Sequence, residues 1–265
     1  MDLKIKDRVA IITGATGGMG FATAKILAEE GCKLVLSDLA IDKLERDAAS
    51  LPGEAICVKA DVTDQAAVDA LAKAAIDRFG TIDIVIHTSG ITGAKGDPLE
   101  MTDADYLEAW QIDFMSAVRM ARATFPTMRE KKRGRFVCIT SENAVQPYWE
   151  EATYNTAKAA LAAFVKNISY EEAKHGILCN TVSPAFIETD MTDGMMEQRA
   201  EKMGVSIDEA VKTFLDEERP GIALKRRGRA DEVASAIALI VSERGSFING
   251  SNMRIDGGSV QAVQN

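Results

Sequence analysis

The sequence has 265 residues, of which 46% are apolar and 27% charged, a balance typical of a globular domain rather than a disordered or fibrous chain. Thirty-one basic against 40 acidic residues give a net charge of −9 and a pI near 4.9, which disfavours nucleic acids and anionic membranes as partners. No apolar run is long enough to span a bilayer, and the two histidines and four scattered cysteines lack metal-ligand or redox-pair spacing, so we expect a cytoplasmic protein without membrane segment or metal site.

Short β-branched runs alternate along the chain with longer segments whose apolar residues recur at helical spacing. Strands are predicted at Val9–Thr13, Leu34–Ser37, Ala55–Lys59, Ile82–His87, Phe136–Thr140, Leu178–Val182 and Met253–Ile255. Helices are predicted at Phe21–Glu30, Asp64–Phe79, Asp103–Lys131, Thr153–His175 and Asp231–Ser242. This alternation predicts an α/β fold of the Rossmann-like, doubly wound type, in which a seven-stranded parallel sheet has helices on both faces.

The segment from residue 184 to residue 228 interrupts this alternation, because methionines, charged residues and Pro220-Gly221 replace the strand pattern. No repeat or linker divides the chain. We therefore expect a single domain over residues 1–265, with 184–228 as a substrate-binding insertion or lid. Whether the insertion's methionines face a substrate, one another or a neighbouring subunit stays open.

A glycine-rich turn over residues 13–20 joins the first strand directly to the first helix. Glycines permit a tight reversal, let the backbone approach a pyrophosphate and leave the helix N-terminus facing the anion. The strand before the turn and the helix after it favour dinucleotide binding over an ordinary turn. Cofactor contacts are expected from Gly14, Gly18, Met19 and Gly20.

The second strand ends at Asp38, whose carboxylate is expected to accept hydrogen bonds from the adenosine ribose hydroxyls and to repel a 2′-phosphate. Leu39 follows it and the glycine turn supplies no cation, so NAD(H) is the predicted cofactor rather than NADP(H). Capping of the next helix is the alternative role for Asp38, although Asp42 is better placed for it. After the third strand, Asp61 and Val62 are expected to contact the adenine. The alternative is that this segment only begins the next helix, and both roles can hold together.

Tyr154 and Lys158 lie four residues apart in a predicted helix, so both side chains emerge on one face. An ammonium group stabilises a nearby phenolate and lowers the phenol pKa toward neutral pH, which suits acid and base catalysis. Ser141 follows the fifth strand, where its hydroxyl could hydrogen-bond a substrate carbonyl oxygen. A tyrosine and a lysine at this spacing are usually structural, but the dinucleotide turn and Ser141 favour catalysis.

With these residues the chain resembles the short-chain dehydrogenase/reductase family over nearly its whole length. Residues 13–20 match the family's TGxxxGxG motif, Tyr154 and Lys158 its YxxxK motif, and Ser141 its preceding serine. The resemblance implies that Tyr154 is the acid/base, that Ser141 positions the substrate oxygen, and that Lys158 lowers the tyrosine pKa and holds the nicotinamide ribose. The family's proline-centred motif implies further cofactor contacts from Pro184, Ile187 and Thr189.

Two regions depart from the family pattern. The chain has His87-Thr88-Ser89-Gly90 where the family has Asn-Asn-Ala-Gly. Gly90 is kept, His87 could contact the cofactor or be structural, and Thr88 is expected to bridge strands. Asp113 replaces an asparagine that holds a water on the family's proton path. Because a carboxylate lacks amide donors, we expect Asp113 to take part in a working relay with altered pH dependence.

The predicted function is NAD(H)-dependent interconversion of a secondary alcohol and a ketone, with 3-oxoacyl, sugar or polyol and steroid-like substrates left open. The C-terminal strand and turn resemble those that pack across a subunit interface in the family, which implies a homotetramer, with a dimer second. The alternatives are a non-catalytic NAD(H)-binding sensor or scaffold and a sugar-nucleotide epimerase or dehydratase. Substrate contacts are expected from Glu142, Gln146, Trp149, Phe186 and Met191.

Overall fold

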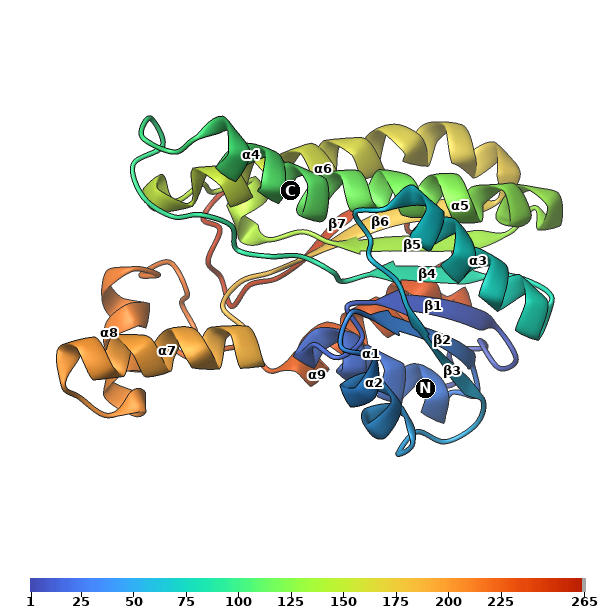
Figure 1. Ribbon diagram of the computed structural model, residues 1–265, viewed down its shortest axis with the longest axis horizontal. Coiled ribbons are helices and arrows are strands. Elements are labelled where there is room, and N and C mark those ends of the chain that lie inside the picture. The colour runs from blue at the N-terminus through green and yellow to red at the C-terminus, as the bar shows by residue number, and fades with distance from the viewer. Residues whose placement is uncertain (264–265) are drawn as a thin grey trace.

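A single parallel sheet organises residues 1–263, which are the residues described by this computed structural model (Figure 1). Within them the strands follow the order β3-β2-β1-β4-β5-β6-β7. The predicted Rossmann-like, doubly wound fold is confirmed. Gln264 and Asn265, which the expected domain includes, lie outside the described residues. The strands are β1 (Val9–Thr13), β2 (Lys33–Asp38), β3 (Ala55–Lys59), β4 (Ile84–His87), β5 (Gly134–Ile139), β6 (Ile177–Pro184) and β7 (Asn252–Ile255).

Helices cover both faces of this sheet (Figure 1). The helices α3, α4, α5 and α6 lie on one face, whereas α1, α2 and α9 lie on the other. Within residues 1–263, no helix is long and apolar enough to cross a membrane. The helices are α1 (Gly18–Glu29), α2 (Ile41–Ala48), α3 (Gln65–Phe79), α4 (Asp103–Trp110), α5 (Ser116–Lys131), α6 (Ala152–Glu172), α7 (Asp190–Met203), α8 (Ile207–Glu217) and α9 (Ala230–Val241).

The central strand β1 shows why the strands read as continuous apolar runs. Its side chains alternate between the two faces: Ala10 and Ile12 pack into the apolar cluster under α1 and α9, while Val9 and Ile11 pack into the cluster under α3, α5 and α6. All four side chains are buried. Burial on both faces therefore removes the apolar–polar alternation that a one-sided sheet would show.

The predicted helix over residues 103–131 is interrupted in the structure. It begins at a capping box formed by Thr102 and Asp105, but a π-helical turn over Gln111–Met115 separates α4 from α5. A π turn inserts one extra residue into the helix and is frequent at functional sites. Here the turn contains Asp113 and directs its side chain toward α6.

The insertion over residues 184–228 forms the helices α7 and α8, which project beyond the carboxyl ends of the strands (orange in Figure 1). They have a small apolar cluster of their own, in which Phe186 and Phe214 pack against each other with ring centroids 4.7 Å apart. Met196 is fully buried in this cluster, whereas Met191 is 53% exposed. The insertion's methionines therefore divide between internal packing and the surface that faces the site.

Candidate active site

The glycine-rich turn lies where the strand order reverses, between β1 and β4. Gly14 has a φ of +63°, and a Cβ there would lie 2.8 Å from the backbone nitrogen of Ser89. A Cβ at Gly20 would overlap the carbonyl oxygen of Gly14. Helix α1 begins at Gly18 with no side-chain cap and no acidic residue in its first turn, which suits an anion at its N-terminus. These residues fit the pyrophosphate of a dinucleotide.

Asp38, at the end of β2, lies beside this turn. Its Oδ2 accepts hydrogen bonds from the backbone nitrogen and hydroxyl of Thr16, at 3.1 and 2.7 Å, and its Oδ1 accepts one from the Ala40 nitrogen at 3.2 Å. The Lys43 ammonium donates to the Thr16 carbonyl at 2.8 Å and pairs with Asp47 at 3.2 Å. Lys43, which comes from α2, supplies a cation that neither Leu39 nor the glycine turn provides, and it was not foreseen in the prediction of NAD(H). The adenosine end therefore presents a carboxylate and an ammonium together.

Asp61 and Val62 follow β3 at the same edge of the sheet. The hydroxyl and the backbone nitrogen of Thr63 donate to Asp61 Oδ1 at 2.7 and 2.8 Å and hold the pKa of this exposed carboxyl below its usual range. Asp64 caps α3 by accepting from the Ala66 nitrogen. The helix start at Asp64 therefore leaves Asp61 exposed at the end of the strand, and the expected adenine contact from Asp61 and Val62 stays a prediction.

Ser141, Tyr154 and Lys158 converge on a cavity of about 500 Å³ at the carboxyl edge of the sheet. Ser141 follows β5, and the other two residues project from the first turns of α6, with the Lys158 Nζ 5.4 Å from the centre of the Tyr154 ring. Met19 of the glycine turn lines the same cavity. Three segments that are distant in the sequence thus bring the predicted residues together next to the dinucleotide turn.

Lys158 and Asp113 form a buried ion pair behind the phenol. The Lys158 Nζ lies 3.1 Å from Asp113 Oδ1 and donates to the Ile139 carbonyl at 3.1 Å. Asp113 is fully buried, and its Oδ1 also accepts from the Ile91 nitrogen at 3.1 Å. A Cβ at Gly90 would clash with Asp113 Oδ1, so the retained glycine makes room for the pair.

This ion pair sets the ionisation of the site. Burial raises the pKa of Asp113 more than Lys158 lowers it. Burial lowers the pKa of Lys158, but Asp113 and Tyr154 together raise it by more. The pKa of Lys158 therefore lies above its usual value. Three effects raise the pKa of Tyr154: desolvation, which is the largest, and the charges of Asp113 and Glu142. Lys158 lowers this pKa, but the net result is an increase. The net direction for Tyr154 is opposite to the lowering expected from the sequence, because burial of the phenol outweighs the ammonium and Asp113 adds to the increase.

Hydrogen bonds also surround the Ser141 hydroxyl. Its Oγ lies 2.9 Å from Glu142 Oε2 and 3.0 Å from Asn143 Oδ1. Glu142 is 3% exposed and lines the cavity, and burial raises the pKa of its carboxyl to about 7. Ser141 and Tyr154 line the same cavity, and Ser141 lowers the pKa of the Tyr154 phenol against the larger effect of burial.

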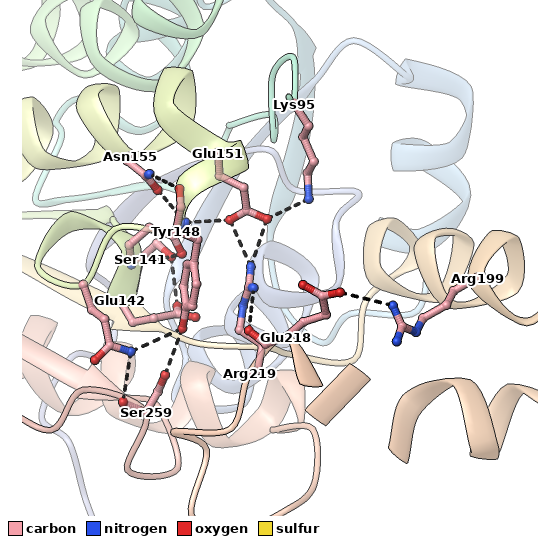
Figure 2. A network of polar contacts seen from close by, with 12 residues as sticks. Lys95, Ser141, Glu142, Tyr148, Glu151, Asn155, Arg199, Glu218, Arg219 and Ser259 are labelled. Atoms are coloured by element: carbon pink, nitrogen blue, oxygen red, sulfur yellow. Dashed lines mark hydrogen bonds and ion pairs between the residues drawn. The ribbon is translucent and has the colours of Figure 1, made fainter. Parts of the chain in front are cut away.

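A polar network continues from Ser141 toward the insertion (Figure 2). Arg219, which follows α8, donates to both carboxylate oxygens of Glu151, at 2.9 and 3.0 Å, and its guanidinium lies 3.6 Å from the centre of the Tyr148 ring. Lys95 donates to Glu151 at 2.7 Å. Lys95, Glu151 and Arg219 all line the cavity. None of these three residues was predicted from the sequence, because no local motif contains them.

His87 lies inside the protein rather than at the cofactor groove. It is 1% exposed, its Nδ1 is 2.8 Å from the Thr13 hydroxyl and its Nε2 is 2.7 Å from the Ser116 hydroxyl. Burial lowers the pKa of His87 to about 3, so the ring is neutral. Thr88 bridges β4 to β1 by donating to the Thr13 carbonyl at 2.6 Å. The structural alternative for His87 fits this geometry, whereas a cofactor contact does not.

The expected substrate residues separate into two groups. Glu142, Phe186 and Met191 line the cavity. Gln146 does not line it, because its amide donates to the Ser259 carbonyl at 3.1 Å. Trp149 is 69% exposed and also lies outside the lining. Gln146 and Trp149 are therefore not among the residues that line this cavity.

The proline-centred segment lines the cavity on the side of the insertion. Pro184 ends β6, and Ile187 pairs with Gly228 through an isolated bridge. Thr189 caps α7 by accepting from the Thr192 nitrogen. A Cβ at Gly18 would lie 3.1 Å from the Thr189 methyl group. Pro184, Ile187 and Thr189 therefore lie on the cavity wall, with Thr189 in contact with the glycine turn.

A parallel sheet with a glycine turn at its switch point and a tyrosine, lysine and serine around the adjoining cavity defines a dinucleotide-binding oxidoreductase. Among residues 1–263, no cluster of three or more histidine, cysteine, aspartate or glutamate side chains could hold a metal ion. A family model described as enoyl-(acyl carrier protein) reductase matches residues 14–260. The chain belongs to the short-chain dehydrogenase/reductase family.

Relatives span the whole chain. Meso-2,3-butanediol dehydrogenase from Serratia marcescens is 31% identical over 258 residues, which cover 97% of this chain and 96% of the relative. The crystal structure of L-sorbose reductase from Gluconobacter frateurii, complexed with NADPH and L-sorbose, matches with a TM-score of 0.94 and 31% identity and covers 99% and 100% of the two chains. The levodione reductase structure matches with a TM-score of 0.90 at 30% identity, covering 98% and 100%. The chain is thus an oxidoreductase of secondary alcohol and ketone groups.

Proposed function

We propose that the protein is an NAD(H)-dependent oxidoreductase in which Tyr154 is the acid/base, Ser141 holds the substrate oxygen and Lys158 and Asp113 set the ionisation of the phenol. The observation that carries this proposal is the convergence of Ser141, Tyr154 and Lys158 on one cavity beside the glycine turn. A bound nicotinamide ring would supply or accept the hydride. Gly14, Gly18, Met19 and Gly20 would hold the pyrophosphate, and Ile187 and Thr189 would hold the nicotinamide half.

The protein's own residues then manage the proton and the oxygen. In the direction of ketone reduction, the Tyr154 hydroxyl donates a proton to the developing alkoxide, and in alcohol oxidation its phenolate accepts one. The Ser141 hydroxyl stabilises the same oxygen by a hydrogen bond. Lys158, held between Asp113 and the Ile139 carbonyl, supplies positive charge beside the phenol and can bind ribose hydroxyls.

We propose NAD(H) rather than NADP(H) because Asp38 lies at the end of β2 beside the glycine turn. A carboxylate there accepts hydrogen bonds from ribose hydroxyls and repels a phosphate. The neighbouring Lys43 is the observation that favours the other cofactor, and L-sorbose reductase was crystallised with NADPH. Rates with both cofactors therefore belong in the first assay.

We propose a compact, polar substrate. The cavity lining includes Lys95, Glu142, Glu151 and Arg219, whose remaining donors and acceptors can hydrogen-bond the hydroxyl or carbonyl groups of a small ligand. The names of the relatives fit this class, since 2,3-butanediol and L-sorbose are small hydroxylated molecules.

The test is a panel of small diols, sugars and ketones followed by NADH and NADPH absorbance, with Tyr154→Phe as the decisive variant. We expect turnover by the natural protein and a loss of more than about a hundredfold in kcat in the variant, with NADH affinity retained in a fluorescence titration. Tyr170→Phe is the matched control, because Tyr170 is 72% exposed and lies outside the cavity lining. NADH binding without turnover on the whole panel would favour a sensor or scaffold instead.

We also propose a homotetramer in the cytoplasm. Surface aromatic and aliphatic side chains support assembly, since Leu107 is 59% and Phe247 fully exposed. The four cysteines are free, which suits a reducing compartment. Light scattering at micromolar concentration tests the assembly, and a monomer would contradict it.

A further inference from the structure

The Glu142 carboxyl lies at the centre of the candidate site, and the proposed function assigns it no catalytic role. It is 3% exposed in the cavity wall, and its Oε2 is 2.9 Å from the Ser141 Oγ. A second acceptor, Asn143 Oδ1, is 3.0 Å from the same Oγ. Two oxygens therefore face one hydroxyl at hydrogen-bond distance.

The orientation of the Asn143 amide follows from its other contacts. Its Nδ2 donates to Glu151 Oε2 at 2.7 Å and to Asn155 Oδ1 at 2.8 Å. Asn155 cannot be reversed, because its own Nδ2 donates to the Tyr148 carbonyl at 2.7 Å, and a carbonyl only accepts. Glu151 is ionised, since Arg219 and Lys95 hold its pKa below the usual range against the effect of burial. Both anchors require Asn143 to present its oxygen to Ser141.

Counting protons then determines the state of Glu142. The Ser141 hydroxyl has one proton, and Asn143 Oδ1 can only accept it. If Glu142 were ionised, its Oε2 would also only accept, and one of the two short contacts would join two oxygens without a proton between them. A neutral Glu142 removes this conflict, because its carboxyl proton completes the second hydrogen bond.

We propose that Glu142 is a neutral carboxylic acid that donates its proton to the Ser141 Oγ and so directs the Ser141 proton toward the substrate oxygen. When a substrate binds, the Ser141 proton is shared between Asn143 Oδ1 and the substrate oxygen, and the Oγ keeps accepting from Glu142. Such consecutive hydrogen bonds strengthen one another. Glu142 is thus a positioning residue that acts through Ser141.

Ionisation of Glu142 would reverse this arrangement. A carboxylate at 2.9 Å would accept the Ser141 proton, and the serine could no longer donate to the substrate. Three titratable groups face Glu142. Arg219 from the insertion favours the ionised form of Glu142, whereas Glu151 opposes it. Tyr154 faces Glu142 from α6. Burial outweighs Arg219 and raises the pKa of Glu142 to about 7. Ketone reduction should therefore decline as the pH rises above neutrality.

This inference rests on the proposed function for its kinetic test, which compares pH profiles of kcat/KM for ketone reduction in the natural protein, Glu142→Gln and Glu142→Ala. The natural protein should lose about tenfold per pH unit above a midpoint near 7. Glutamine keeps a donor at the same place but cannot ionise, so Glu142→Gln should lose this decline. Alanine removes the donor and should lower kcat/KM by about tenfold at all pH values.

Glu150→Gln is the matched control, because Glu150 is an exposed acid in the same connection between β5 and α6 and should leave the profile unchanged. A profile of Glu142→Gln that superimposes on that of the natural protein would overturn the proposal. So would a loss in Glu142→Gln as large as that in Glu142→Ala.

A measurement without turnover separates this inference from the proposed function. Infrared difference spectra between the natural protein and Glu142→Gln should contain a neutral carboxylic acid band below pH 7 that disappears above it. Absence of this band below pH 7 would refute a neutral Glu142 even in an active enzyme. Its presence in a protein that turns over no substrate would leave the protonation assignment intact and refute only the proposed function.

Discussion

Replacing Asp113 by asparagine removes the charge that balances Lys158 while keeping the shape of the side chain. Asp113 Oδ1 lies 3.1 Å from the Ile91 nitrogen and 3.1 Å from the Lys158 Nζ. The Oδ1 of an asparagine can still accept hydrogen bonds from both. The variant therefore isolates the charge of Asp113 from its hydrogen bonds. With that charge removed, the Lys158 ammonium stabilises the Tyr154 phenolate without opposition, and the phenol pKa should fall.

The size of this effect follows from two distances. Asp113 Oδ1 is 3.1 Å from the Lys158 Nζ, which is 5.4 Å from the centre of the Tyr154 ring, so the carboxylate lies within about 8.5 Å of the ring. Two unit charges at that separation interact by about 2 kcal/mol at an effective dielectric constant of about 20. The pH midpoint of alcohol oxidation, which needs the phenolate, should therefore fall by about one pH unit.

The assay is the pH dependence of kcat for alcohol oxidation in the natural protein and in Asp113→Asn, with thermal unfolding as the check on folding. Asp103→Asn serves as the control, because Asp103 is an exposed acid in the first turn of α4. Its profile should superimpose on that of the natural protein. If the Asp113→Asn profile also superimposes, Asp113 does not act on Tyr154, and the electrostatic account of the site is refuted.

Two further changes test the cofactor site. Asp38→Ala with Leu39→Arg should move the ratio of kcat/KM for NADH over NADPH by more than about tenfold toward NADPH, and an unchanged ratio would remove Asp38 from cofactor selection. Gly20→Ala should weaken NADH binding by more than about tenfold, because its Cβ overlaps the Gly14 carbonyl oxygen. Gly194→Ala, where a Cβ meets nothing within 4 Å, should leave the affinity unchanged in the same fluorescence titration.

The sequence was sufficient for the sheet because the inner strands β1, β4 and β5 are buried along their whole length and read as largely apolar runs, while the half-buried edge strands β3 and β7 are short and rich in β-branched or apolar residues. β1 and β3 have the predicted bounds, and the other strands differ by a few residues at their ends. Helix α2 was absent from the predicted helices, since Leu44 is its one buried residue and most of the others are charged or exposed. Apolar periodicity identifies a helix only where an apolar face packs against the core.

Among the residues of the candidate site, some could be predicted from the sequence and others could not. Residues carried by local motifs were identified, whereas Lys95, Asn143, Glu151 and Arg219 come from separate segments that only the fold brings together. The π turn around Asp113 could not be predicted from the sequence either, because its extra residue depends on how the helix packs and not on residue type. That turn changes the chemistry, since it places the Asp113 carboxylate in direct contact with the lysine.

The balance of charge around the phenol explains how these unpredicted contacts act together. Asp113 neutralises Lys158 in the buried pair, and burial raises the pKa of the Tyr154 phenol. The phenol therefore lies in a desolvated site with little net positive charge, and its pKa is raised. A protonated tyrosine and a serine whose proton points away from Glu142 are both donors. Below pH 7 the site is thus already in the protonation state that ketone reduction requires, whereas alcohol oxidation must first remove the proton from Tyr154.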